Sequence, residues 1–178
     1  MSKAERLINQ LYEEVEERHL YAIVDTGIYK EFEDILDIED PEHRILFKED
    51  FIEEYESVAP YLVRLEKDEA WSDELIALGS GQTWLTFLFS SREIDSLAEI
   101  LKERINPYSE KHEREIIMRF YDPRNLSRYF KMHTEQEWSM FLEELGGGFA
   151  YIDLEEQNDL HLYTTPEPQC IRLHKEIK

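Results

Sequence analysis

Residues 83–89 read TWLTFLF and carry the strongest strand signal in the chain. β-Branched and aromatic side chains, which dominate this run, favour the extended and pleated backbone. Apolar residues then recur at helical intervals from Ile94 to Ile105. Residues 115–121 predict a further strand, so strand alternates with helix through the middle of the chain. That order favours an α/β fold in which helices pack on a sheet.

Upstream of this unit, the sequence predicts another helix and two more strands. A helix is expected over residues 3–18, where apolar residues recur at helical spacing and glutamates occupy much of the remaining surface. Residues 19–24, HLYAIV, form a nearly continuous apolar run, which is typical of a strand buried on both faces. Residues 59–65, APYLVRL, alternate apolar side chains after a proline, which suits a strand that begins at a sheet edge.

Downstream, two helix starts and one helix stop are evident. Asp122 followed by Pro123 combines a good N-cap with proline at the first helical position, before a helix over residues 123–131. Residues 134–137, TEQE, form a capping box before a second helix. The three glycines at 146–148 end that helix.

The C-terminal region predicts two strands, residues 149–154 and 160–165, joined by a polar turn. Together with the central alternation, they complete the expected fold. We expect a single domain over residues 1–178 of the α/β class, with helices packed on a mixed β-sheet. A C-terminal β-hairpin and a tail would occupy residues 146–178.

The composition indicates a folded and strongly acidic protein. Hydrophobic residues make up 42% of the 178 residues, which is enough for a core. The 41 acidic and 20 basic residues leave a formal net charge of −21. Such a surface repels phosphate backbones, so no nucleic acid is expected as a partner. The acidity suits solubility and could steer the chain toward a basic partner.

Several features predict a cytoplasmic location. The single cysteine, Cys170, excludes an intramolecular disulfide, which fits a reducing compartment. The densest apolar run, Trp84 to Phe89, is far shorter than the ~20 residues that cross a bilayer, so no membrane span is expected. The N-terminal residues lack the apolar core of a signal peptide.

Two aspartates are the main candidates for catalysis or metal binding. Asp25 and Asp122 each end an apolar run, and ligands of open α/β sheets gather at the carboxyl ends of strands. Paired carboxylates there would suit a magnesium ion or acid–base catalysis. The structural interpretation weighs more, because Asp122 before proline is a helix cap and Asp25 before Thr-Gly fits a turn. The six histidines are scattered without zinc-binding spacing.

Arg119 is unusual because it lies inside an apolar stretch. On a strand, Arg119 and Tyr121 would share one face, while Phe120 would take the other. A guanidinium in such a place needs a carboxylate partner. We expect Asp25, on a neighbouring strand, to supply it.

Four stretches carry a resemblance to a known family. In chain order they are YAIVD (21–25), APYLV (59–63), GQTWLTFLFS (81–90) and RFYDPR (119–124). Across roughly residues 5–145, this ordered set resembles the effector chaperones of bacterial type VI secretion, also called adaptors and formerly known only as a domain of unknown function. The signature residues of these stretches are Asp25, Pro60, Tyr61, Trp84 and Pro123.

The resemblance implies a cytoplasmic protein that binds a toxic effector and helps load it onto the secretion spike protein, with no enzyme activity and no cofactor. Two alternatives stay open: an immunity protein that binds a basic toxin, and a small metal-dependent enzyme that uses Asp25 and Asp122. Trp138 and Phe141 lie on a helix where such side chains are more often core than interface. The candidate protein-binding residues are Arg119, Tyr121, Asp122, Arg124, Trp138, Met140 and Phe141.

Overall fold

A computed structural model describes residues 3–15, 18–152, 159–164 and 169–172. The strands are β1 (His19–Asp25), β2 (His43–Ile45), β3 (Pro60–Leu65), β4 (Leu85–Ser90), β5 (Tyr108–Ser109), β6 (Arg114–Glu115), β7 (Gly147–Ile152), β8 (Asp159–Tyr163) and β9 (Gln169–Arg172). The helices are α1 (Lys3–Val15), α2 (Phe32–Glu39), α3 (Glu49–Tyr55), the 3-10 turn η1 (Glu56–Val58), α4 (Ala70–Gly79), α5 (Ile94–Ile105), α6 (Pro123–Lys131) and α7 (Glu135–Leu145).

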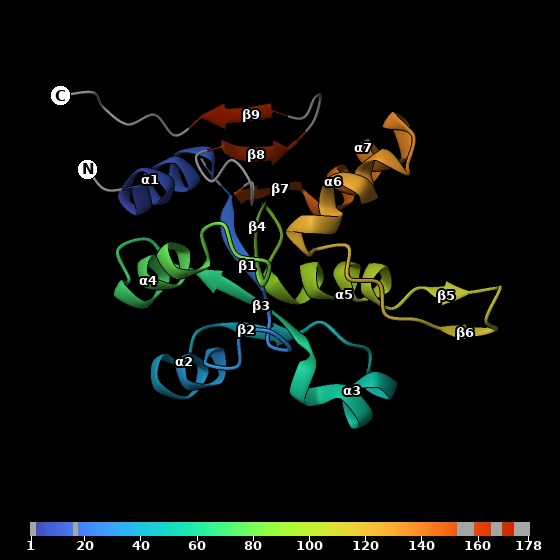
Figure 1. Cartoon of the computed structure of the whole chain (residues 1–178). Coiled ribbons are helices and arrows are strands. Elements are labelled where there is room, and N and C mark those ends of the chain that lie inside the picture. Colours follow the sequence, from blue (N-terminus) through green and yellow to red (C-terminus); the bar gives the residue numbers. More distant parts are fainter. Residues whose placement is uncertain (1–2, 16–17, 153–158, 165–168, 173–178) are drawn as a thin grey trace.

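Seven strands form one sheet in the order β2-β3-β1-β4-β7-β8-β9 (Figure 1). The α/β class, the packing of helices on a sheet and the C-terminal hairpin of β7 and β8 are confirmed. The connections through helices make β1 parallel to β2, and β3 parallel to β4. A third, antiparallel strand lies between the members of each pair, however, so every described pair of neighbours in this sheet is antiparallel.

Both faces of the sheet are buried, as the apolar run at 19–24 predicts. Along β1, Leu20, Ala22 and Val24 join one apolar cluster, while Tyr21 and Ile23 join another. The first cluster packs under α1, α2 and α4, and the second under α3, α5, α6 and α7. Figure 1 shows these two groups of helices on opposite sides of the sheet. Asp25 alternates onto the same face as Tyr21 and Ile23.

The strand expected over residues 115–121 is wrong for most of its length. Only Glu115 is in a strand, as part of a separate two-stranded ribbon with β5 that extends from the body of the molecule (Figure 1). The amides of Ile116 and Met118 instead donate to the carbonyls of Pro107 and Ile105, near the end of α5. Phe120 and the residue after it are buried against the face of the sheet. A segment can therefore bury its apolar side chains on the face of a sheet without pairing with the sheet as a strand.

The helix boundaries after this segment agree with the sequence. Helix α6 begins after Asp122 with Pro123 in its first turn, and α7 begins with the complete Thr134–Glu137 capping box. Gly146 ends α7 with φ of 70°, in the left-handed region that glycine tolerates. Strand β9 was not predicted. None of the helices in the described ranges combines the length and apolar character needed to cross a membrane.

Candidate functional site

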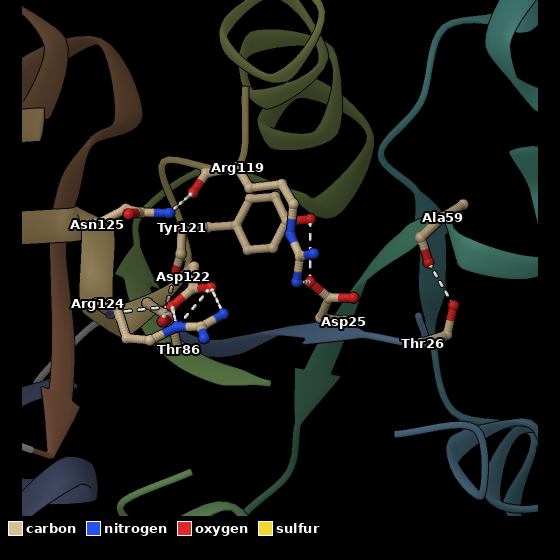
Figure 2. Close-up of polar contacts among 9 residues, drawn as sticks. All are labelled: Asp25, Thr26, Ala59, Thr86, Arg119, Tyr121, Asp122, Arg124 and Asn125. Carbon is tan, nitrogen blue, oxygen red and sulfur yellow. Dashed lines mark hydrogen bonds and ion pairs between the residues drawn. The ribbon is translucent and has the colours of Figure 1, made fainter. Parts of the chain in front are cut away.

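The carboxylate of Asp25, at the end of β1, is the centre of a buried polar network. Asp25 is only 2% exposed. Its Oδ2 accepts a charge-assisted hydrogen bond from Arg119 and a 3.4 Å hydrogen bond from the hydroxyl of Tyr121 (Figure 2). The predicted pairing of Arg119 with Asp25 is therefore confirmed. It ties the end of β1 to the segment that leads into α6.

The environment of this network sets its protonation. Burial raises the pKa of the Asp25 carboxyl, and the Arg119 guanidinium opposes that rise. Burial also raises the pKa of the Tyr121 phenol, and the neighbouring Asp25 charge raises it further. Tyr121 therefore stays protonated and acts as a hydrogen-bond donor. Arg119 and Tyr121 together compensate the buried carboxylate of Asp25.

Asp122 has the structural role of a helix cap. Its side chain accepts a 2.9 Å hydrogen bond from the amide of Arg124, which satisfies a free N–H of the first turn of α6. The Arg124 guanidinium also donates to both carboxylate oxygens of Asp122, with Nε 3.0 Å from Oδ1 and 3.1 Å from Oδ2. Figure 2 shows Asp25 and Asp122 bonded to different arginines. Within the described ranges, no three His, Cys, Asp or Glu side chains are grouped so that they could hold a metal ion.

Buried hydroxyl groups anchor the same region, and sequence reasoning missed them. Thr86 of β4 donates a 2.5 Å hydrogen bond to the carbonyl of Tyr121, and Ser90 donates to the carbonyl of Leu145 (Figure 2 shows the first). Thr26 donates to the carbonyl of Ala59 at 2.7 Å. For Thr86 and Ser90, the signal in the sequence was a hydroxyl residue within the otherwise apolar strand β4.

Beside the Asp25 network lies an open groove with a volume of about 770 Å³, which we call the α5–α6 groove. It runs between α5, residues 117–120 and α6. Its apolar lining includes Ile117, Met118, Tyr129 and Met132. Ile117 is 38% exposed and Met132 is 72% exposed, so the groove presents apolar surface to solvent.

A smaller pocket of about 270 Å³ continues the groove toward α7, and we call it the α7 pocket. The two cavities share Arg104, Tyr129 and His133 as lining residues. The guanidinium of Arg104 lies 4.6 Å from the ring centroid of Phe141. The α5–α6 groove and the α7 pocket therefore adjoin each other, and we call the two cavities together the depression across α5, α6 and α7.

Residues 20–140 match the family model described as "Domain of unknown function (DUF4123)". The chain belongs to the DUF4123 family. The match extends from β1 into α7, so this DUF4123 domain includes the Asp25 network and most of the α5–α6 groove. Neither a curated protein nor a solved structure matches the chain.

The structure brings several predicted binding residues of the DUF4123 domain to this depression. Arg119 lines the α5–α6 groove, and Trp138, Met140 and Phe141 line the α7 pocket. Met140 is 61% exposed, whereas Phe141 is buried and belongs to the core. The part of α7 that is exposed at this pocket therefore consists of Met140 and part of Trp138. Helix spacing suggested this helix, but only the structure shows which of its faces is free.

The other predicted binding residues do not line either cavity. Tyr121 and Asp122 are buried behind the groove, and Arg124 is exposed at the start of α6. Their contacts hold the segment before α6 and the helix start in position. In the DUF4123 domain, these residues shape the groove from behind.

The signature residues build the framework. Pro60 begins β3, and Pro123 occupies the first turn of α6. The ring of Trp84 stacks on Tyr29 with centroids 4.1 Å apart. Half-buried Tyr61 contacts the ring of Phe32 edge-on. With Asp25, these residues set the position of strands and helix starts.

Proposed function

We propose that this DUF4123 protein is a cytoplasmic adaptor that binds a type VI secretion effector and helps load it onto the spike protein. The observation that carries the proposal is the open apolar α5–α6 groove beside the Asp25 network. The resemblance to effector chaperones supplies the specific role. The protein would bind its partners without changing them chemically.

The chemistry of the groove supports protein binding. Exposed apolar surface on a strongly charged protein is typical of interaction sites. Ile117, Met132 and Met140 provide such surface along one depression. Methionine side chains adapt readily to the shape of an apolar partner. A groove between helices also suits a partner segment that is apolar on one face.

The alternative of a metal-dependent enzyme has less support. Asp25 and Asp122 are both buried, and each already binds an arginine. A shared ion would have to displace both ion pairs. The immunity-protein alternative draws support from the net charge of −21, which would attract a basic toxin.

Co-purification tests the proposal. The tagged chain is expressed in its native bacterium, and proteins retained with it are identified by mass spectrometry. We expect an effector together with a spike component. Recovery of a toxin without any spike component would favour the immunity protein, and recovery of neither would contradict the proposal.

A matched pair of variants ties the result to the groove. Met132→Asp places a charge in the groove, whereas Ile38→Asp places one on α2, and the two side chains are similarly exposed at 72% and 76%. We expect the first variant to lose effector capture and the second to keep it. Thermal unfolding of both variants checks that each is folded.

A further inference from the structure

Helix α6 carries a charge opposite to that of the molecule. Its nine residues include Arg124, Arg128 and Lys131 and no acidic residue, whereas the whole chain has a formal net charge of −21. The cations are spaced by four and three residues, so they lie along one side of the helix. Arg128 also lines the α5–α6 groove.

Two of these cations have no carboxylate partner among the described residues. Arg124 is bound to Asp122, but neither Arg128 nor Lys131 forms an ion pair with any residue in the described parts of the chain. Both side chains are exposed. In a protein with 41 acidic residues, α6 therefore keeps two positive charges available to an external group.

The two acidic residues that line the groove, Glu103 and Glu144, each form an ion pair with a cation. Glu103 accepts from Lys48 at 2.9 Å, and Glu144 lies 3.5 Å from Arg104. The groove thus combines an apolar floor with a positive border formed by α6. Its local charge is the reverse of what the composition of the chain suggests.

We infer that the α5–α6 groove binds an acidic amphipathic segment of the partner protein. The segment's apolar side chains lie in the groove, near Ile117 and Met132, and its carboxylates pair with Arg128 and Lys131. Charge complementarity of this kind sets which segment binds and in which orientation. This inference rests on the proposed function and names the chemistry of the bound segment. It contrasts with the basic partner that the total charge favours.

Two synthetic peptides of about 14 residues test the inference with purified protein. They share one apolar face of leucine and phenylalanine, and carry either glutamate or lysine along its border. Binding is measured by fluorescence anisotropy at about 150 mM salt, where long-range attraction between the acidic surface and the lysine peptide is screened. We expect the glutamate peptide to bind more tightly.

Charge-reversal variants locate the binding site. The double variant Arg128→Glu/Lys131→Glu is expected to weaken binding of the glutamate peptide by about tenfold or more. The control Lys30→Glu/Lys67→Glu makes the same change in net charge at exposed positions beside α2 and α4, and should keep binding within about twofold. Equal losses in both double variants would overturn the inference. So would a lysine peptide that binds as tightly as the glutamate peptide and is lost in Met132→Asp.

Effector capture separates this inference from the proposed function. If the wild-type chain captures no effector, the proposed function fails, whatever the peptides show. If Arg128→Glu/Lys131→Glu captures as much effector and spike component as the wild type, the proposed function stands and the inference of an acidic segment paired with α6 is overturned.

Discussion

At the scale of single residues, the pair of Arg119 and Asp25 is the most consequential contact. Asp25 is buried, while the Arg119 side chain is 40% exposed. The Asp25 carboxylate therefore depends on Arg119 for compensation of its charge. Removing one member of such a pair leaves a buried charge uncompensated. The exposure of Arg119 allows water to replace part of its effect, which reduces the cost below that of a fully buried pair.

We expect Arg119→Ala to lower the free energy of unfolding by about 1–3 kcal/mol near pH 7.5, and by less near pH 5. The pKa of Asp25 is raised in the folded protein, so folding disfavours its charged form and this penalty grows as pH rises through that pKa. Loss of Arg119 raises the pKa of Asp25 further. Denaturant unfolding at both pH values measures the difference.

The variant Asp25→Asn provides the control for this pH dependence. In Asp25→Asn/Arg119→Ala, no carboxyl remains at position 25, so the additional cost at neutral pH should disappear. A single Arg119→Ala variant with wild-type stability at both pH values, and unchanged partner binding, would contradict the role given to the pair.

At the scale of secondary-structure elements, the two helices around the groove depend on their caps. The capping box of α7 satisfies backbone donors at both ends of the Thr134–Glu137 pair. The backbone hydrogen bond from Thr134 also lowers the pKa of the Glu137 carboxyl. These contacts fix where α7 begins, and so position the α7 pocket.

Thr134→Ala should destabilise the protein by about 1 kcal/mol, because the amide of Glu137 loses its side-chain acceptor. Ser139→Ala is the matched control, since it also removes a hydroxyl group from this region but lies in the interior of α7. Chemical denaturation of both variants measures the effect. Equal destabilisation would show that the cap itself contributes nothing.

At the junction between α7 and β7, the backbone of Gly147 lies close against the backbone of β4. A Cβ atom at Gly147 would lie 1.7 Å from the carbonyl oxygen of Phe89 in β4. This oxygen belongs to the backbone of β4, which cannot move aside as a flexible side chain would. The close approach explains why the chain needs glycine where β7 joins β4.

Gly147→Ala should therefore separate the first residues of β7 from β4 and cost at least about 2 kcal/mol. Hydrogen exchange should accelerate at the amides of Gly147–Ile152 more than at those of β1. A variant with wild-type stability and exchange would show that the two strands can adjust without loss of pairing.

At the scale of the whole molecule, charge is unevenly distributed. The 41 acidic and 20 basic residues repel one another on balance, although surface ion pairs such as Arg44–Asp95 at 2.5 Å offset part of that repulsion. The ion pair lowers the pKa of Asp95 through its hydrogen bond with Arg44. Net repulsion of this size opposes the compact state.

We expect the melting temperature to rise when salt increases from about 20 to about 300 mM, because screening weakens the net repulsion. Calorimetry at neutral pH measures the shift. Sodium chloride and choline chloride should act alike, since screening depends on ionic strength. A melting temperature that falls with either salt would show that ion pairs outweigh the repulsion.

Local patterns in the sequence determined the elements that depend on neighbouring residues. The alternating and continuous apolar runs predicted β1, β3 and β4, and the caps at Asp122 and Thr134 predicted the starts of α6 and α7. Capping and periodicity involve residues a few positions apart, so they can be recognised without a fold. The partner of Arg119 was also predicted, because Asp25 ends an apolar run that indicates a buried strand.

Only the tertiary structure decided the order of the strands and the surface that they leave open. Residues 116–121 have a strand-like pattern, but hydrogen bonds to the end of α5 and burial on the sheet face hold them outside the sheet. The α5–α6 groove combines residues from three separate segments. The formal net charge of −21 gives no indication that this groove has a positive border. Which side chains meet across such distances depends on how the chain packs, and no local pattern encodes that.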